Sequence, residues 1–167
     1  NVGPATLVNS TFAGNSANQG SGIDNHNTLD STNVIFADGC GGSINDHGGN
    51  LDVGVSCGFD TAHSNANLDL GPLQDNGGPT FTRLPLAGSP AIDKGLPGGT
   101  PPEFDQRGTG FPRVIGARVD VGAVETSYPL AATGQTLNLW IPIVGGVLLL
   151  GGAAAIIINV LRRRRLS

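Results

Sequence analysis

The chain has 167 residues, of which 38% are hydrophobic and only 13% are charged, and its formal net charge is −4. Residues 1–138 hold all thirteen acidic groups and five basic ones, a net charge of −8, and the other four basic groups are the arginines at 162–165. Nucleic-acid binding needs basic groups spread over a surface, so this distribution argues against a nucleic-acid-binding protein. It is typical instead of a chain that crosses a membrane near its end.

The start of the sequence differs from that of a complete secreted protein. There is no methionine, and residues 1–12 lack the basic and then apolar segments of a secretion signal. We therefore expect a piece of a longer exported protein, with further sequence before Asn1.

The first part of the chain contains an internal repeat. Residues 7–15 match residues 31–39, so that Asn9 aligns with Asn33 and Phe12 with Phe36. A composition rich in Gly, Asn and Ser also fits a disordered chain, but the ordered spacing of the apolar residues favours short stacked strands. The predicted fold class is all-β: the terminal coils and irregular cap of a right-handed parallel β-helix, followed by a single C-terminal transmembrane helix. The residues expected in its core are Leu7, Phe12, Ile23, Leu29, Val34 and Phe36.

Cys40 and Cys57 are the only cysteines in the chain. An even number of cysteines in an exported chain most often pairs, so we predict a disulfide between them. His47 and His63 flank the pair and leave a zinc site as the alternative, although such a site would want more ligands. Our prediction includes neither a metal nor another cofactor.

Four turn-rich stretches follow. Residues 70–80 read Leu-Gly-Pro-Leu-Gln-Asp-Asn-Gly-Gly-Pro-Thr and residues 87–95 read Ala-Gly-Ser-Pro-Ala-Ile-Asp-Lys-Gly. Asp-Gln-Arg-Gly at 105–108 and Val-Asp-Val-Gly-Ala-Val-Glu at 119–125 come later. These stretches resemble the choice-of-anchor Q domain, which closes the C-terminal end of bacterial surface β-helices. The resemblance covers about residues 1–125 and implies an attachment signal downstream.

Asp93, Asp105, Arg107 and Asp120 lie in these stretches. We predict that they form a structural cluster of ion pairs and hydrogen bonds that locks the irregular turns. The alternative is that the three carboxylates bind Ca²⁺ or hydrolyse a glycosidic bond. No acidic pair recurs at the repeat spacing, which disfavours the catalytic alternative.

An apolar run occupies positions 139–161, with Asn159 its only strongly polar side chain, and is followed directly by the arginines at 162–165. A helix of that length spans roughly 34 Å, enough to cross a hydrocarbon core of about 30 Å. Clustered arginines stay on the cytoplasmic side. We therefore predict a transmembrane helix over 139–161 and a basic cytoplasmic tail over 162–167, with the acidic part outside.

Just before this run lies the pentapeptide Leu-Ala-Ala-Thr-Gly at 130–134. Pentapeptide, apolar run and basic tail resemble, in this order, the cell-wall sorting signal of Gram-positive bacteria in its Leu-Ala-x-Thr-Gly form. The resemblance implies that a sortase thiolate cleaves between Thr133 and Gly134 and passes the chain to a peptidoglycan precursor. A plain membrane anchor that stays intact is the alternative. The implied recognition residues are Leu130, Ala131, Ala132, Thr133 and Gly134, and the stop-transfer residues are Arg162, Arg163, Arg164 and Arg165.

The predicted domains are the coils and cap at 1–125, a linker with the sortase motif at 126–138, the membrane span at 139–161 and the tail at 162–167. We predict a non-catalytic, adhesin-like or structural protein that is extracellular and anchored to the cell wall or membrane. Its expected partners are a sortase, the peptidoglycan precursor, the membrane and a polysaccharide or host-surface ligand. The alternative function is the C-terminal part of a secreted polysaccharide lyase or hydrolase whose catalytic coils lie upstream.

Overall fold

The computed structural model describes residues 1–18, 21–60, 63–64, 66–97 and 101–128. The chain divides by its internal contacts into two units, Asn1–Tyr128 and Pro129–Ser167, and every described residue belongs to the first. The described residues contain eight short strands and no helix. The strands are β1 (Ala5–Val8), β2 (Thr11–Phe12), β3 (Ile23–Asp24), β4 (Leu29–Thr32), β5 (Ile35–Phe36), β6 (Cys40–Gly41), β7 (Asn45–Asp46) and β8 (Leu51–Asp52).

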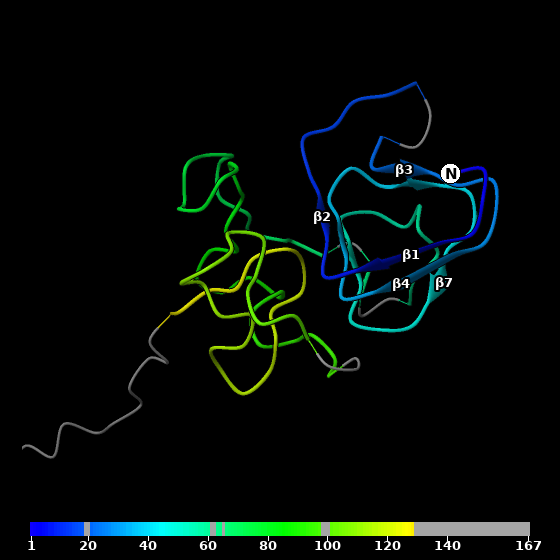
Figure 1. Cartoon of the computed structure of the whole chain (residues 1–167). Helices are drawn as coiled ribbons and strands as arrows, with labels where there is room; N and C mark the ends of the chain where they lie inside the picture. The colour runs from blue at the N-terminus through cyan, green and yellow to red at the C-terminus, as the bar shows by residue number, and fades with distance from the viewer. Residues whose placement is uncertain (19–20, 61–62, 65, 98–100, 129–167) are drawn as a thin grey trace, which may run out of the picture. The chain divides into compact units, whose positions relative to one another are not determined.

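The strands form three small parallel sheets, ordered β1-β4-β7, β2-β5-β8 and β3-β6. Figure 1 shows β1 and β4, in blue, lying side by side as the chain winds back over itself. Ala5 pairs with Leu29 and Phe12 with Phe36, so the alignment given by the sequence repeat is confirmed as the register of β1–β4 and β2–β5. Parallel pairing in this register places like side chains on one another, and the Phe12 and Phe36 rings stack 5.6 Å apart.

Strand β5 is buried on both of its faces. Ile35 belongs to an apolar cluster with Leu51 and Val121, whereas Phe36 belongs to a second cluster on the other side of the strand. Neighbouring residues of a strand point to opposite faces, so an uninterrupted apolar run is what a strand buried on both faces requires. Of the six predicted core residues, Leu29, Val34 and Phe36 are buried, and Leu7, Phe12 and Ile23 are partly buried.

Asparagine forms the corner between strands in both copies of the repeat. Asn9 and Asn33 have φ angles of 48° and 56°, in the left-handed region that asparagine tolerates better than most residues. The Asn33 side chain is buried, accepts a hydrogen bond from Leu96 N at 2.7 Å and donates one to Leu96 O at 2.9 Å. The second corner is thereby joined to a segment that lies much further along the chain.

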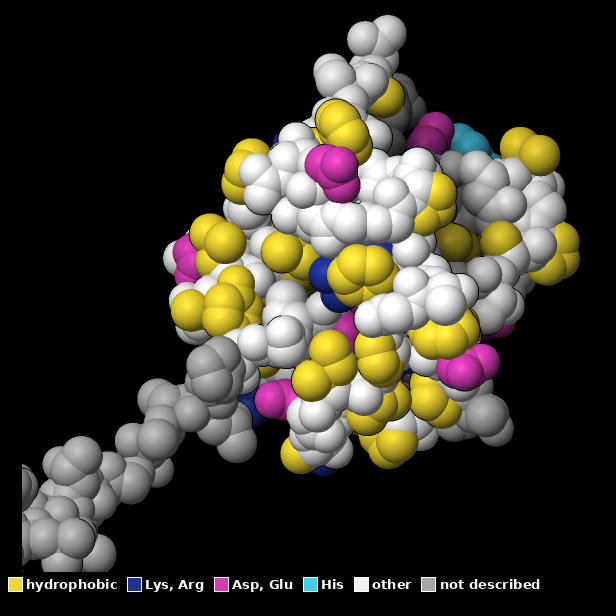
Figure 2. All heavy atoms as spheres, turned by 60° about the vertical axis from the view of Figure 1, so that its left-hand side comes forward, with side chains coloured by type: hydrophobic (Ala, Val, Ile, Leu, Met, Phe, Trp, Pro, Cys, Tyr) yellow, Lys and Arg dark blue, Asp and Glu magenta, His cyan; other side chains and the backbone are white. Residues whose placement is uncertain are grey.

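After Asp52 the described chain continues as an irregular region, residues 53–128, with three isolated antiparallel bridges in place of strands. This region covers the free edge of β8, because Asp52 N donates to His63 O and Ala66 N donates to Asp52 O. It also contacts the corner of the repeat, where Gly122 N donates to Asn33 O. Figure 2 shows hydrophobic side chains in several separate groups on one face of the molecule, with few basic side chains among them.

The predicted fold class, a right-handed parallel β-helix with regular coils, is wrong. The described residues form only short parallel strands in three small sheets. Ile35 pairs with Thr11 on one side and with Leu51 on the other, and Leu51 is the nearer of the two along the chain. The sequence spacing between paired residues is therefore not constant, as a regular coil would require. Beyond Asp52, frequent Gly and Pro prevent regular pairing.

Among the residues that the structure describes, no helix is long and apolar enough to cross a membrane. The apolar run at 139–161, on which the predicted transmembrane helix falls, lies outside the described residues. The pentapeptide at 130–134 and the arginines at 162–165 also lie outside them.

Candidate functional site

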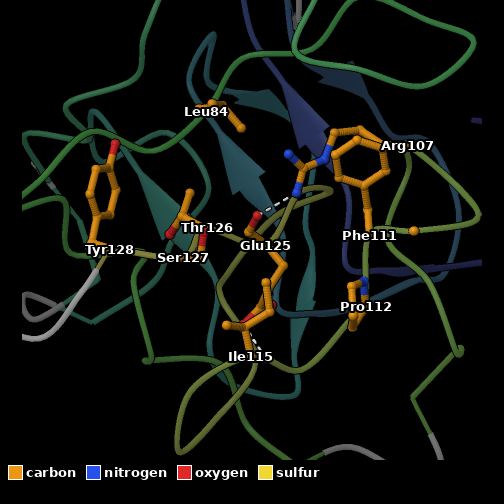
Figure 3. Close-up of a pocket in the computed structure, with 10 residues that line it drawn as sticks. Leu84, Arg107, Phe111, Pro112, Ile115, Glu125, Thr126, Ser127 and Tyr128 are labelled. Atoms are coloured by element: carbon orange, nitrogen blue, oxygen red, sulfur yellow. Dashed lines mark hydrogen bonds between the residues drawn. The ribbon is translucent and has the colours of Figure 1, made fainter.

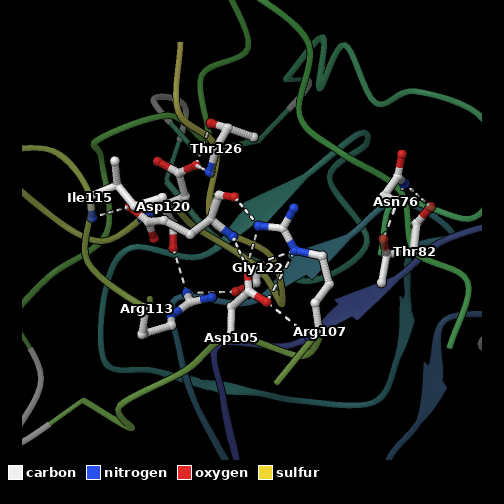
Figure 4. A network of polar contacts seen from close by, with 10 residues as sticks. Asn76, Thr82, Asp105, Arg107, Arg113, Ile115, Asp120, Gly122 and Thr126 are labelled. Carbon is white, nitrogen blue, oxygen red and sulfur yellow. Dashed lines mark hydrogen bonds and ion pairs between the residues drawn. The ribbon is translucent and has the colours of Figure 1, made fainter. Parts of the chain in front are cut away.

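A network of buried charged side chains lies within the irregular region (Figure 4). Asp105 is 7% exposed, and Arg113, Asp120 and Glu125 are each 1% exposed. Charges are buried at a high cost in free energy unless they are paired and hydrogen-bonded, so their contacts show what holds them in place.

Asp105 and Arg107 form a two-pronged ion pair. Arg107 Nη2 lies 2.6 Å from Asp105 Oδ2, and Arg107 Nε lies 3.1 Å from the same oxygen and 3.2 Å from Oδ1. Asp105 also accepts hydrogen bonds from Arg107 N at 2.7 Å and from Glu125 N at 2.8 Å. The Arg107 guanidinium also lies over the Phe111 ring, with 4.2 Å between Arg107 Cζ and the ring centroid. The Asp105 carboxylate therefore holds two segments of backbone and the Arg107 side chain in place.

Asp120 is hydrogen-bonded to two other segments of the chain, at Asp93 and at Glu125–Thr126. Its Oδ1 accepts from Asp93 N at 2.8 Å, and its Oδ2 accepts from Thr126 N at 2.8 Å and from Thr126 Oγ1 at 2.6 Å. The backbone N–H of Asp120 donates to Glu125 Oε2 at 3.0 Å. This hydrogen bond closes a tight loop of backbone between Asp120 and Glu125.

Arg113 lies beside these carboxylates. Its Nη2 donates to the carbonyl oxygens of Asp120, at 2.8 Å, and Gly122, at 2.7 Å. Burial lowers the pKa of Arg113 from its ordinary value, and the nearby carboxylates of Glu125, Asp105 and Asp120 oppose that shift. Its Nε and Nη1 atoms are buried and have no acceptor among the described residues.

Glu125 borders a pocket of about 370 Å³ that Arg107, Phe111, Ile115 and Tyr128 also line (Figure 3). Burial raises the pKa of Glu125 to about 7, and the charge of Asp120 adds to the shift. Hydrogen bonds from Asp120 N and Ile115 N and the charge of Arg113 act in the opposite direction. A carboxyl group with a raised pKa in a pocket is a candidate acid–base group, but both oxygens of Glu125 accept backbone hydrogen bonds.

The structure joins the four residues of the predicted cluster through backbone as much as through side chains. Asp105 and Arg107 form an ion pair, and Asp120 accepts from the backbone of Asp93, whose own Oδ1 accepts from Arg118 N at 3.4 Å. Arg113 and Glu125 were not predicted as members of the cluster. Glu125, which lies in the stretch 119–125, links Asp120 to the Asp105–Arg107 pair. Within the described residues, no group of three or more His, Cys, Asp or Glu side chains is placed to hold a metal ion.

Cys40 and Cys57 form a disulfide with 4.9 Å between their Cα atoms, as predicted. The two flanking histidines point to carboxylates. His47 Nε2 lies 2.9 Å from Asp30 Oδ1, and His63 Nδ1 lies 2.8 Å from Asp60 Oδ1. Disulfides form and persist in oxidising compartments, so the bond indicates an extracellular or otherwise oxidising environment.

Reduction of this disulfide is expected to lower the free energy of unfolding by about 3 kcal/mol, because the bond closes a loop in the unfolded chain between cysteines with a sequence separation of 17. Urea unfolding of the oxidised and the dithiothreitol-treated protein measures the difference. The double variant Cys40→Ser, Cys57→Ser should match the reduced protein in either buffer. A midpoint that is the same with and without the bond would contradict the expected contribution.

No family model matches the chain, and no curated protein or solved structure is significantly similar to it. The resemblances described for residues 1–125 and 130–165 therefore stay predictions.

Proposed function

We propose that this chain is displayed outside a Gram-positive cell and attached to the cell wall by a sortase, as part of a structural or adhesin-like surface protein. One observation carries the proposal: the Leu-Ala-Ala-Thr-Gly pentapeptide, the apolar run at 139–161 and the arginines at 162–165 follow one another closely. Each part is common by itself, and the order and spacing of all three make the signal specific. Retention of the apolar run in the membrane, with the arginines inside, would hold the pentapeptide at the outer face.

Two features of the described unit support export and a non-catalytic role. The Cys40–Cys57 disulfide suits an oxidising environment. The carboxylates of Asp105, Asp120 and Glu125 are each occupied by hydrogen bonds from the chain itself, which suits a locking function better than acid–base chemistry on a substrate. We propose that the irregular region protects the strand edge at β8 in the way that capping segments protect other stacked-strand proteins.

The attachment reaction proceeds in two acyl-transfer steps. A sortase cysteine thiolate attacks the carbonyl carbon of Thr133, the Thr133–Gly134 peptide bond breaks, and the amine of Gly134 takes up a proton and leaves. An amine of the peptidoglycan precursor then attacks the thioester, forms a new amide at Thr133 and releases the cysteine. Gly134 has no side chain to hinder the scissile carbonyl. In this chemistry the protein is a substrate.

Replacement of Thr133 tests the proposal. In a sortase-positive host, Thr133→Ala is expected to reduce the protein recovered covalently bound to the wall at least tenfold, because it changes the residue whose carbonyl is attacked. Thr136→Ala, just beyond the pentapeptide, is the matched control and should leave wall attachment unchanged. Immunoblots of muramidase-released and detergent-released fractions measure both variants.

Equal amounts of wall-bound protein for Thr133→Ala and the unchanged chain would refute cleavage at this site. Full recovery of the unchanged chain in the detergent fraction would leave the plain membrane anchor as the function of residues 130–167.

A further inference from the structure

The segment at 119–126, called the exit segment below, lies at the end of the folded unit, which closes at Tyr128. Segments at the end of a domain are usually poorly ordered unless they are tied down. The exit segment is buried instead, and Asp120, Val121 and Glu125 are each 1% exposed. The end of this unit is therefore part of its interior.

The exit segment is hydrogen-bonded to the stacked strands. Gly122 N donates to Asn33 O at 2.9 Å, and Ala123 N donates to Thr11 Oγ1 at 3.0 Å. Asn33 forms the corner between β4 and β5, and Thr11 begins β2. A pull on the exit segment therefore has a direct path to the strands, one that avoids the turns at 53–90.

Its last two residues are held by a group of hydrogen bonds to charged side chains (Figure 4). Thr126 N and Oγ1 donate to Asp120 Oδ2 at 2.8 and 2.6 Å. Glu125 N donates to Asp105 Oδ2 at 2.8 Å, and Glu125 O accepts from Arg107 Nη2 at 2.6 Å. Hydrogen bonds to charged groups are stronger than those between neutral groups. Because these bonds lie on adjacent residues, a pull on the chain beyond Thr126 strains them together instead of one after another.

The two carboxylates that receive this strain are shielded from water and held in place. Asp105 is 7% exposed and Asp120 is 1% exposed, so little water reaches them to compete for a strained hydrogen bond. Asp105 is paired with Arg107, and Asp120 accepts from Asp93 N at 2.8 Å. Strain on the last two residues of the exit segment is therefore passed to the segments around Asp93 and Asp105.

We propose that the exit segment is a mechanical latch, which keeps the unit folded when its C-terminal end is pulled. The role of the latch rests on the proposed attachment at Thr133, because a protein fixed there receives tension from the wall at this end. Unfolding under force is governed by the rate of unfolding. The latch slows that rate, since its hydrogen bonds must break before the buried exit segment can leave the interior.

Optical-tweezer unfolding of the full 167-residue chain in detergent tests the latch. One DNA handle is attached through azidophenylalanine at Val55, which is 70% exposed. The other handle is attached either after Ser167 or through azidophenylalanine at Leu73, which is 57% exposed. The first geometry pulls through the exit segment and the second does not. At the same constant force, the unchanged chain is expected to stay folded at least about tenfold longer in the first geometry.

Replacement of Thr126 by valine removes the hydroxyl donor and keeps the shape of the side chain and the backbone N–H. Thr126→Val is expected to unfold at least about tenfold faster in the first geometry, because it loses a hydrogen bond to a buried carboxylate. In the second geometry its rate should stay within about threefold of that of the unchanged chain. Thr126→Ser, which keeps a hydroxyl donor, should restore most of the resistance.

The matched control is Thr82→Val, measured in the first geometry. Thr82 is 3% exposed, and its Oγ1 accepts a hydrogen bond from Asn76 Nδ2 at 3.1 Å, so the control also loses one hydrogen bond of a buried threonine. Thr82 lies outside the exit segment, and its replacement should change the unfolding rate by no more than about threefold.

Equal acceleration of Thr126→Val in both geometries would show that Thr126 stabilises the fold without carrying tension, and would overturn the proposal. An unchanged rate in the first geometry would overturn it as well. Should Thr126→Val fail to fold, a shorter lifetime of the unchanged chain in the first geometry than in the second would be decisive against the latch. These measurements involve no sortase, so they are separate from the Thr133→Ala test of wall attachment.

Discussion

Replacement of Asp105 by asparagine is expected to lower the free energy of unfolding by about 3–5 kcal/mol, because it removes one partner of a buried ion pair. The Asp105 side chain is fully buried and Arg107 is nearly so. Both carboxylate oxygens accept hydrogen bonds, Oδ1 from Arg107 and Oδ2 from Arg107 and Glu125. An asparagine NH₂ group placed at either position would face donors, and the Arg107 charge would remain buried without a counter-charge.

Denaturant unfolding followed by fluorescence or circular dichroism measures this loss. Asp75→Asn is the matched control: Asp75 is exposed and accepts one hydrogen bond, from Gly77 N, which the amide oxygen of asparagine can also accept. Its effect should stay within about 0.5 kcal/mol. A loss below about 1 kcal/mol for Asp105→Asn would show that the pair does not hold the irregular region together.

The stability of the protein is expected to fall as the pH rises from about 4.5 to 7, through the titration of Glu125. Its pKa is about 7 in the folded chain, against an ordinary value of 4.5. Between these values the folded state binds a proton that the unfolded state does not, so folding is favoured at the lower pH. The contribution is fully present below pH 4.5 and is lost as the pH passes 7. A shift of this size corresponds to roughly 3 kcal/mol.

To isolate the contribution of the Glu125 carboxyl group, the free energy of unfolding is measured at pH 5 and at pH 8 for the unchanged chain and for Glu125→Gln. The variant cannot ionise, so its change between the two pH values should be smaller by most of this amount. Glu103→Gln, at the only other glutamate, which is exposed, should keep the full dependence. Identical pH dependence in Glu125→Gln and the unchanged chain would mean that the buried carboxyl does not titrate in this range.

The pairing of strands could be predicted where the sequence repeats itself. The alignment of Asn9 with Asn33 and of Phe12 with Phe36 predicted the correct register of four strands, because parallel stacking requires like residues at like positions. The regular coil expected from that repeat was wrong. The residues of β6, β7 and β8 lie closer in sequence to their partners than the residues of β4 and β5 lie to theirs in β1 and β2. No match between stretches of sequence indicates this shorter spacing.

The candidate site could be predicted only in part. Asp105 and Arg107 lie close together in an Asp-x-Arg stretch, so their contact is local. The side chains of Arg113 and Glu125 bind mainly backbone carbonyl and N–H groups of their partners. Nearly every residue carries these groups, so the residue types of the partners could not predict the contacts. The disulfide was predictable because the chain contains only two cysteines.

Mass spectrometry of the protein released from the cell wall by a muramidase tests the proposed attachment most directly. If a sortase processes this chain, the C-terminal peptide ends at Thr133 and carries the mass of a peptidoglycan stem fragment on its carboxyl group. A C-terminal peptide that continues through Gly134 towards Ser167 without any added mass would contradict that attachment.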